Sequence, residues 1–282
     1  MSENFLSELS APVLTLIGQG EKSVRGTKWQ DPESLGITSA HVPELIRVIE
    51  EIDLFWGDDP SDEKYDFAPI HAWRALGQLK AEAAIQPLIE LVIWNEEEDG
   101  DWIMEEIPEV MAKIGPVCIP ILQAALLKNI NLEWTATTIA HCLSDVGQAH
   151  PEHRLECIAS LDAGLEKYAE NLEMVNAFLI SFLNKLKAVE SLPLIEEAFK
   201  AEKVDFSVIG DFEEVQIELG VLTERITPRP RFNNFFDPDF LFASEKDELK
   251  QENQRKKEQK KKEKKKKKDA KKARKRHKGK SK

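Results

Sequence analysis

The sequence predicts an all-α protein, an α-solenoid of stacked helical hairpins that is followed by a disordered Lys-rich C-terminal tail. Apolar residues recur three or four positions apart through most of the chain, as they do on one face of a helix. The pattern of a helical hairpin, two helices joined by a short turn, is found at residues 68–92 and recurs in altered form three more times. Each unit is too short to bury its two apolar stripes alone, and stacking against neighbouring units is the usual solution.

The unit at residues 68–92 is the clearest of the four, and its copies lie at about 105–127, 134–167 and 176–200. Its stripes are Ala72, Ala75, Leu76 and Leu79 in the first helix, then Ile85, Leu88, Ile89 and Val92 in the second. The residues that correspond to Leu79 in the copies are Ile114, Val146 and Leu186. These four anchors are 35, 32 and 40 residues apart, which is the period of a two-helix repeat.

A direct internal match supports the repeat: the segment LKA at residues 79–81, followed by PLIE at 87–90, is echoed at 186–188 and 193–196. The second helices carry a proline near their start, where the first backbone N–H groups lack a helical partner anyway. These prolines are Pro87, Pro120 and Pro193. Gly77 and Gly115 fall near the turns, where a close approach of the paired helices or a positive φ favours glycine.

An Ala-rich first helix, Leu-Gly or Ile-Gly near the turn and Pro-Leu-Ile in the second helix together resemble the short HEAT-like repeats first named in phycobilisome lyases. The resemblance covers about residues 67–200 and extends more weakly to 37–56. It implies an α-solenoid that binds partners along its surface, and a minority of such proteins are enzymes.

The predicted solenoid spans residues 1–226, with the repeats at about 67–200. Residues 1–56 are expected to form an irregular N-terminal hairpin with helices at about 4–17 and 40–55, because terminal repeats are commonly atypical.

A capping helix is expected at about residues 211–220, with Asp211 as its N-cap, Glu214 placed as in a capping box and Gly220 at its end. Residues 227–243 combine prolines with five phenylalanines, which favours an extended aromatic strap along the last unit. The alternative is a short linear motif that docks on another protein.

The charge of the chain is divided between two regions. Residues 251–282 carry 19 Lys and Arg against 4 Asp and Glu, whereas the other 250 residues carry 20 against 47. The tail at 244–282 is nearly free of apolar residues and is expected to be disordered. It either solubilises the protein, binds RNA, DNA or a ribosomal surface, or lies on the chain's own acidic connectors. The candidate binding residues are Lys264, Lys265, Lys266, Lys267, Lys268, Arg274 and Arg276.

Composition also limits the classes of protein. Three cysteines in 282 residues do not indicate a disulfide framework, so a reducing compartment is expected. The N-terminus lacks the features of a secretory signal, and no apolar run approaches a membrane span of about 18 residues. We therefore expect a soluble cytoplasmic protein.

Two acidic runs, residues 58–63 and 96–99, lie beside tryptophans and form a candidate rim for a basic protein ligand. The alternative is solvated loops that cap helices. Two more candidates, His71 and Trp73, stand next to core positions of the clearest unit. They are expected either to line a binding groove or to pack between repeats. The four aromatic candidates are Trp56, His71, Trp73 and Trp94.

A weak candidate metal cluster lies near the turn of the third copy, although its spacing matches no standard zinc motif. Its members are His141, Cys142, His150, His153 and Cys157. The sequence contains no phosphate-binding glycine loop, nucleophile elbow or His-Glu-x-x-His motif. We therefore expect a non-catalytic protein-binding scaffold without cofactor. A protein that binds nucleic acid or ribosomes through the tail is the second hypothesis, and a lyase or glycosylase is the third.

Overall fold

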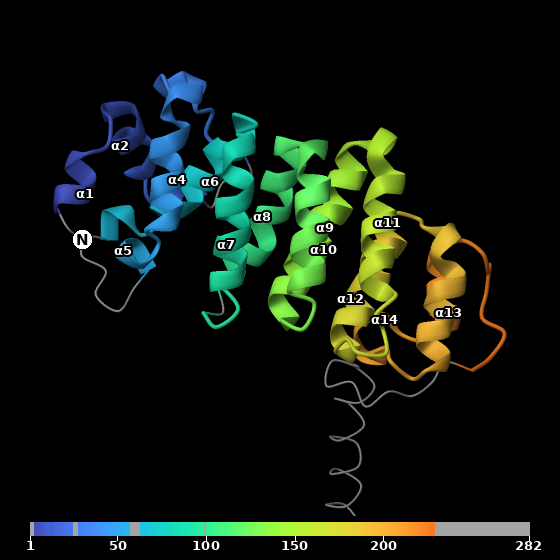
Figure 1. Ribbon diagram of the computed structural model, residues 1–282. Helices are drawn as coiled ribbons and strands as arrows, with labels where there is room; N and C mark the ends of the chain where they lie inside the picture. The colour runs from blue at the N-terminus through green and yellow to red at the C-terminus, as the bar shows by residue number, and fades with distance from the viewer. Residues whose placement is uncertain (1–2, 25–27, 57–62, 99, 229–282) are drawn as a thin grey trace, which may run out of the picture. The chain divides into compact units, whose positions relative to one another are not determined.

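The computed structural model describes residues 3–24, 28–56, 63–98 and 100–228, and within these ranges the regular elements are all helices (Figure 1). The solenoid expected at 1–226 therefore lies almost wholly inside the described part of the chain. The strap expected at 227–243 falls outside the described residues from 229 onward, as does the whole tail with its candidate lysines and arginines.

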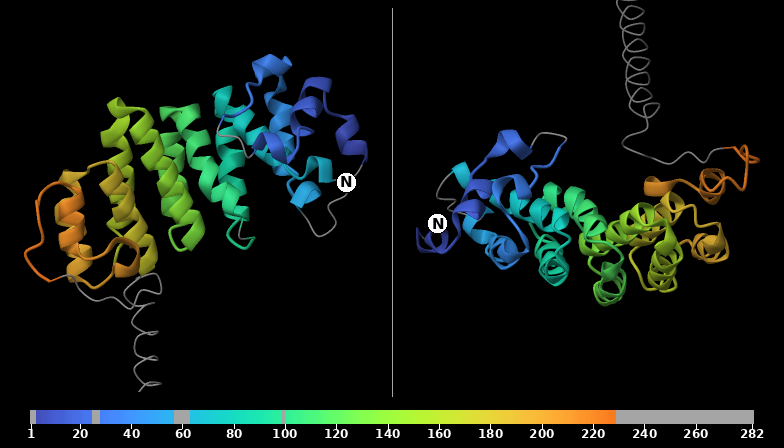
Figure 2. Two further views of the ribbon diagram at one scale, coloured as in Figure 1. Left: turned by 180° about the vertical axis from the view of Figure 1, so that it is seen from behind. Right: turned by 90° about the horizontal axis from the view of Figure 1, so that it is seen from above.

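Four helical hairpins form the centre of the protein, in the order that the repeats predict. They are α6 (Ala68–Gln78) with α7 (Ile85–Trp94), α8 (Asp101–Ile114) with α9 (Ile119–Lys128), α10 (Glu133–Ala149) with α11 (Arg154–Leu165), and α12 (Glu173–Lys185) with α13 (Leu192–Lys200). The first helices α6, α8, α10 and α12 pack side by side in one layer, and the second helices α7, α9, α11 and α13 pack in the other (Figures 1 and 2). The predicted α-solenoid of HEAT-like hairpins is confirmed.

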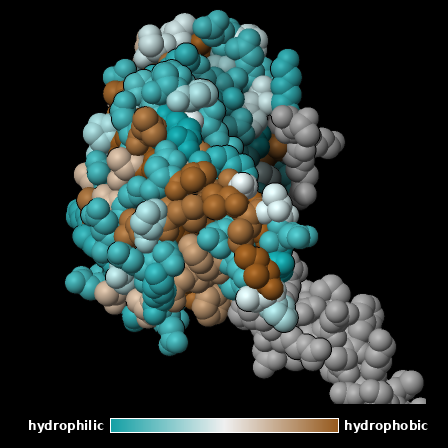
Figure 3. All heavy atoms as spheres, turned by 90° about the vertical axis from the view of Figure 1, so that its right-hand side faces the viewer, coloured by the Kyte–Doolittle hydropathy of each residue, from teal (hydrophilic) through white to brown (hydrophobic). Residues whose placement is uncertain are grey.

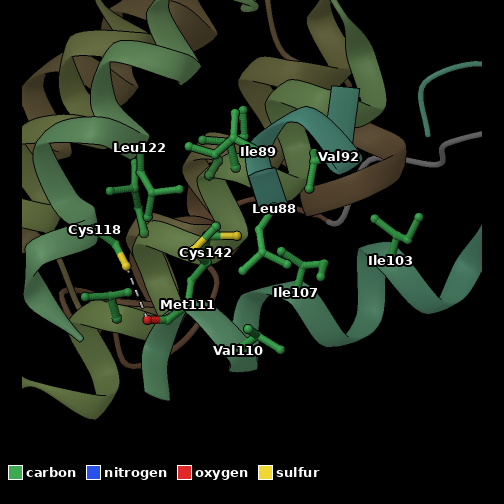
Figure 4. Packing of buried hydrophobic residues seen from close by; sticks show 14 of the residues in the cluster. Leu88, Ile89, Val92, Ile103, Ile107, Val110, Met111, Cys118, Leu122 and Cys142 are labelled. Carbon is green, nitrogen blue, oxygen red and sulfur yellow. Dashed lines mark hydrogen bonds between the residues drawn. The ribbon is translucent and has the colours of Figure 1, made fainter. Parts of the chain in front are cut away.

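The core runs through the stack without a break between hairpins. Figure 4 shows side chains of α7, α8, α9 and α10 meeting in one apolar cluster. Buried members from these four helices are Leu88, Ile107, Val110, Leu122 and Cys142. Because each layer of apolar side chains touches the next hairpin, no unit has to bury its stripes alone.

The N-terminal region contains more and shorter helices than the sequence predicts. In place of two long helices it forms α1 (Glu3–Ser7), α2 (Ala11–Ile17), α3 (Glu21–Val24), α4 (Val42–Glu50) and α5 (Asp53–Trp56). Pro12 and Pro43 explain the later starts of α2 and α4, since each lies at the first or second position of its helix. A proline has no N–H to donate and clashes with the preceding turn, so it is favoured at a helix start, although Pro108 lies inside α8.

A helix, α15 (Phe212–Glu218), lies where the capping helix is expected, and the single turn α14 (Phe206–Ile209) precedes it. The Asp211 carboxylate accepts the Glu214 N–H at 3.0 Å, as an N-cap does, and Gly220 follows the helix with φ 76°. The Glu214 carboxylate accepts a hydrogen bond from Arg225, which also pairs with Asp211 and so holds the following segment against α15.

Three of the four hairpin turns hold a residue with positive φ, and the turn between α10 and α11 does not. Lys80 and Lys187 have φ values of 50° and 55°, and Gly115 has φ 110° at the corresponding place. At the two lysines the next residue closes a Schellman turn, in which Ala81 N–H donates to Leu76 C=O and Ala188 N–H to Leu183 C=O, each at 3.0 Å. The LKA echo therefore marks two copies of the same helix end.

The second helices begin after a 3₁₀ turn, at Glu82–Ala84, Pro116–Cys118, Pro151–His153 and Val189–Ser191. Gly77 allows two helices to approach closely, but these are α6 and α8 of neighbouring hairpins and not the two helices of one hairpin. A Cβ on Gly77 of α6 would lie 3.2 Å from Val110 Cα of α8.

No single helix in the described ranges is long and apolar enough to cross a membrane; α8 and residues 116–128 reach that composition only together, across a bend of 110°.

Candidate protein-binding surface

A groove of about 350 Å³ lies between α4 and α7, which pack against each other. Its lining combines apolar side chains with two carboxylates, and consists of Ile49, Glu50, Ile52, Pro87, Glu90, Leu91 and Trp94. Ile49, Ile52 and Leu91 are buried, Trp94 is half-buried, and both glutamates are exposed. The groove can therefore accept an apolar side chain while its rim attracts positive charge.

Trp94 is the last residue of α7, and the connector after it is held by hydrogen bonds. Asn95 is buried, and its Oδ1 accepts the Gly100 N–H at 2.9 Å. The Glu96 carboxylate accepts the N–H groups of Trp134 and Thr135, at 3.4 and 2.7 Å. The negative charge of Glu96 thus offsets the partial positive charge at the start of α10, where backbone N–H groups lack helical partners. This part of the second acidic run serves a helix end, while Glu97 and Glu98 are exposed.

Of the other three aromatic candidates, His71 and Trp73 lie in the interior, which is a correction to their expected place on a binding groove, whereas Trp56 is half-buried, as Trp94 is. Trp73 is fully buried and its Nε1 donates to Glu106 at 2.9 Å. Trp56 packs edge-on against Trp73, with ring centroids 5.8 Å apart, and its Nε1 donates to Asp66 C=O. His71 is 3% exposed, and its burial lowers its pKa to about 4. His71 and Trp73 therefore pack between repeats, which was the alternative interpretation.

An ion pair that the sequence analysis missed lies beside these residues. Arg74 of α6 contacts Glu106 of α8 through two nitrogens, its Nε at 2.8 Å from Oε2 and its Nη2 close to Oε1. Both side chains are nearly inaccessible to solvent. Arg74 is the one Arg, Lys, Asp or Glu residue in α6, but Glu106 is one of three glutamates in α8, and one sequence does not show that these two charges meet.

The candidate metal cluster is not assembled. His141 stacks on Phe182, with ring centroids 5.0 Å apart, and His153 lies 2.9 Å from Glu156 at the surface. His150 lies 2.9 Å from Ala112 C=O, on the neighbouring hairpin. Among the described residues no group of three or more His, Cys, Asp or Glu is placed to hold a metal ion.

The cysteines are poor ligands for a second reason. Cys118, Cys142 and Cys157 are buried and free. Burial raises the pKa of the Cys118 thiol to about 12 and that of Cys157 to about 11, and it raises the pKa of Cys142 as well. Because zinc binds the thiolate, these protonated thiols fit the role of small core side chains better.

Two further surface features lie elsewhere on the stack. An open hollow of about 480 Å³ lies at the turns of three hairpins, and its lining includes Lys80, Lys113 and His150 as well as Asp31 and Glu33. The C-terminal end of the described stack, which faces the viewer in Figure 3, shows an apolar patch. The exposed apolar side chains in this part of the chain include Val221 and Ile226, which are 46% and 77% exposed.

The comparisons with known proteins agree with the architecture. Residues 71–93 match the family model described as the PBS lyase HEAT-like repeat. These residues lie in α6 and α7, which form the first of the four hairpins. No curated protein and no solved structure matches the chain. The chain therefore carries a HEAT-like repeat at the hairpin that borders the groove.

Proposed function

We propose that this protein is a non-catalytic scaffold that binds a basic or amphipathic segment of another protein in the groove between α4 and α7. The observation that carries the proposal is the groove itself, with half-buried Trp94 above buried Ile49 and Leu91, and with Glu50 and Glu90 on its rim. Tryptophan beside a small apolar pocket is typical of the residues that dominate binding energy at interfaces.

The chemistry of the groove limits what it accepts. A single aliphatic or aromatic side chain that becomes fully buried contributes roughly 1.5–3 kcal/mol. The exposed carboxylates add little to affinity, but they speed the encounter with a basic partner and disfavour an acidic one. The surface around the groove supports this preference, since the connector after Trp94 holds exposed Glu97 and Glu98.

The Lys-rich tail supports a second candidate function. The net charge of +15 on residues 251–282 favours binding of a polyanion such as nucleic acid, with affinity that falls steeply as salt rises. In the scaffold proposal the tail only holds the complex near such a polyanion.

Affinity capture distinguishes the two functions. The full chain and a chain that ends at residue 245 are each used to capture proteins from lysate, with and without nuclease. The scaffold proposal predicts that partners remain on residues 1–245 after nuclease treatment. Loss of all partners with either the tail or the nucleic acid contradicts it and favours the second function.

A further inference from the structure

The groove between α4 and α7 carries its two carboxylates on different helices. The residues of α7 that line it are spaced three or four positions apart, which places them on one face of that helix over two turns, roughly 10 Å. The other wall comes from the end of α4 and the turn after it, and holds Ile49, Glu50 and Ile52. A segment bound in the groove therefore has Glu50 on one side and Glu90 on the other.

Neither carboxylate is neutralised within the described part of the chain. Glu90 accepts a hydrogen bond from the Gln86 amide at 3.1 Å, and neither Glu50 nor Glu90 forms an ion pair with another described residue. Arg47 is the one basic residue of α4, and its guanidinium pairs with Glu8 at 2.7 Å, whereas α7 has no basic residue. Both negative charges are therefore available to cations of a bound molecule.

The surroundings of the groove are acidic as well. Residues 42–56 and 84–98, which include both walls, carry eight Asp and Glu against one Arg and no Lys. Glu44 and Glu96 accept backbone N–H groups of other segments. The other six acidic residues are exposed, and they are Glu50, Glu51, Asp53, Glu90, Glu97 and Glu98. An apolar groove within such a negative surface is complementary to an apolar side chain that has positive charges beside it.

We propose, on the basis of the function proposed above, that the partner segment carries one apolar anchor side chain between two lysines or arginines. The anchor packs on Trp94 and the apolar floor of the groove, one cation pairs with Glu50 on α4, and the other pairs with Glu90 on α7. Lysine and arginine suit this position because their aliphatic stems cover apolar surface while their charged ends reach the rim. The segment thereby bridges the N-terminal region and the first repeat hairpin.

The test begins with a displayed library of random dodecapeptides, selected on the full chain after removal of the peptides that also bind the Trp94→Ala variant. We expect the recovered peptides to share an aromatic or aliphatic residue with Lys or Arg on both sides. One of them is synthesised with a fluorescent label, and its dissociation constant for the full chain is measured by fluorescence anisotropy at low and at high salt.

Two conservative variants of the full chain then test the two cation contacts separately. Glu50→Gln and Glu90→Gln should each raise the dissociation constant roughly twofold to fivefold at low salt, which is the effect of losing one exposed ion pair. The difference from the parent should shrink at high salt because the charges are screened. The control is Glu197→Gln, which changes an exposed glutamate of α13 and should leave the dissociation constant unchanged.

The outcomes separate this inference from the function on which it rests. Peptides that depend on Trp94 but lack a basic residue on one or both sides of the anchor overturn the inference and leave the groove as a binding site. Unchanged affinity in both Gln variants, while these keep the helical circular dichroism of the parent, does the same. Failure to recover any peptide that depends on Trp94 contradicts the proposed function, and the inference with it.

Discussion

Arg74 and Glu106 form a buried ion pair that joins the first helices of two neighbouring hairpins, α6 and α8. Glu106 also accepts a hydrogen bond from the buried Trp73 indole, so both of its oxygens have partners. The Arg74 guanidinium also donates a hydrogen bond to the carbonyl of Val24, at the end of α3.

Breaking this pair should be costly. Glu106→Gln leaves the Arg74 guanidinium buried without a counter-charge, and removal of one partner of a buried pair typically costs about 3–5 kcal/mol. We expect the free energy of unfolding, measured by urea denaturation, to fall by an amount in this range. The control is Glu196→Gln, which breaks the exposed Lys200–Glu196 pair and should cost less than about 1 kcal/mol. Equal losses in the two variants would show that burial of the first pair has no energetic effect.

Gly77 tests how closely α6 and α8 pack. Gly77→Ala places a methyl group 3.2 Å from the Val110 backbone, which cannot move without shifting α8, and overpacking of this kind costs about 1–3 kcal/mol. Gly164→Ala is the matched control, because its nearest neighbour, at the same 3.2 Å, is the mobile end of the Leu126 side chain. Thermal denaturation should show a loss for the first variant and a clearly smaller change for the second.

The left-handed turn residues offer a stabilising change. Lys80→Gly and Lys187→Gly relieve a side chain at positive φ, and part of this gain is lost to the larger freedom of glycine in the unfolded chain. We expect Lys80→Gly to gain about 0.5–1 kcal/mol in the free energy of unfolding. Lys187→Gly should gain less, because it also removes the hydrogen bond from Lys187 Nζ to Glu218 C=O. Gln123→Gly, inside α9, should instead lose about 1 kcal/mol. A loss of stability at both lysine positions would mean that the turns do not have this conformation in solution.

His71 predicts a specific dependence of stability on pH. Its pKa in the folded protein is about 4, against an ordinary value of 6.5, because burial disfavours the charged ring and the positive charge of Arg74 adds to this effect, against the opposing influence of the Gly20 carbonyl and Glu106. The unfolded chain therefore binds a proton that the folded chain does not between these two values, and stability falls as pH drops from about 6.5 toward 4. At pH 5 the loss relative to pH 8 should approach 2 kcal/mol.

The matched variant is His71→Gln, which keeps a polar side chain near the Gly20 carbonyl but removes the titrating ring. Its unfolding free energy should change less between pH 8 and pH 5 than that of the parent. The surface variant His153→Gln serves as the control and should keep the pH dependence of the parent. If His71→Gln and the parent lose the same stability, another group is responsible.

Much of the fold could be predicted from the sequence, because the four units bury their apolar stripes in the same way. The stripe in α6 and its counterparts in the later copies determine which faces meet, and the LKA echo coincides with two Schellman turns of the same form. The N-terminal helices were harder to predict, since Pro12 and Pro43 shift the helix starts in a region without a second copy for comparison.

The candidate site was only partly predictable. Trp94 stands next to an acidic run in the sequence and does border a groove. Trp56 also stands next to an acidic run, but it is half-buried with its ring packed edge-on against the buried Trp73. The place of Trp29 between the cations of Arg74 and Lys113 had no local signal, since these partners are distant in the chain and meet only when two hairpins stack.

The measurement that tests the central claim most directly compares two tryptophan variants of the full chain. Trp94→Ala removes the aromatic wall of the groove, whereas Trp134→Ala removes a tryptophan that is 37% exposed at the start of α10 and is not part of the groove. Proteins captured from nuclease-treated lysate are quantified against the parent chain. The scaffold proposal predicts that the main partner falls at least tenfold with Trp94→Ala and is retained with Trp134→Ala. Full retention with Trp94→Ala, or equal loss with both variants, would contradict it.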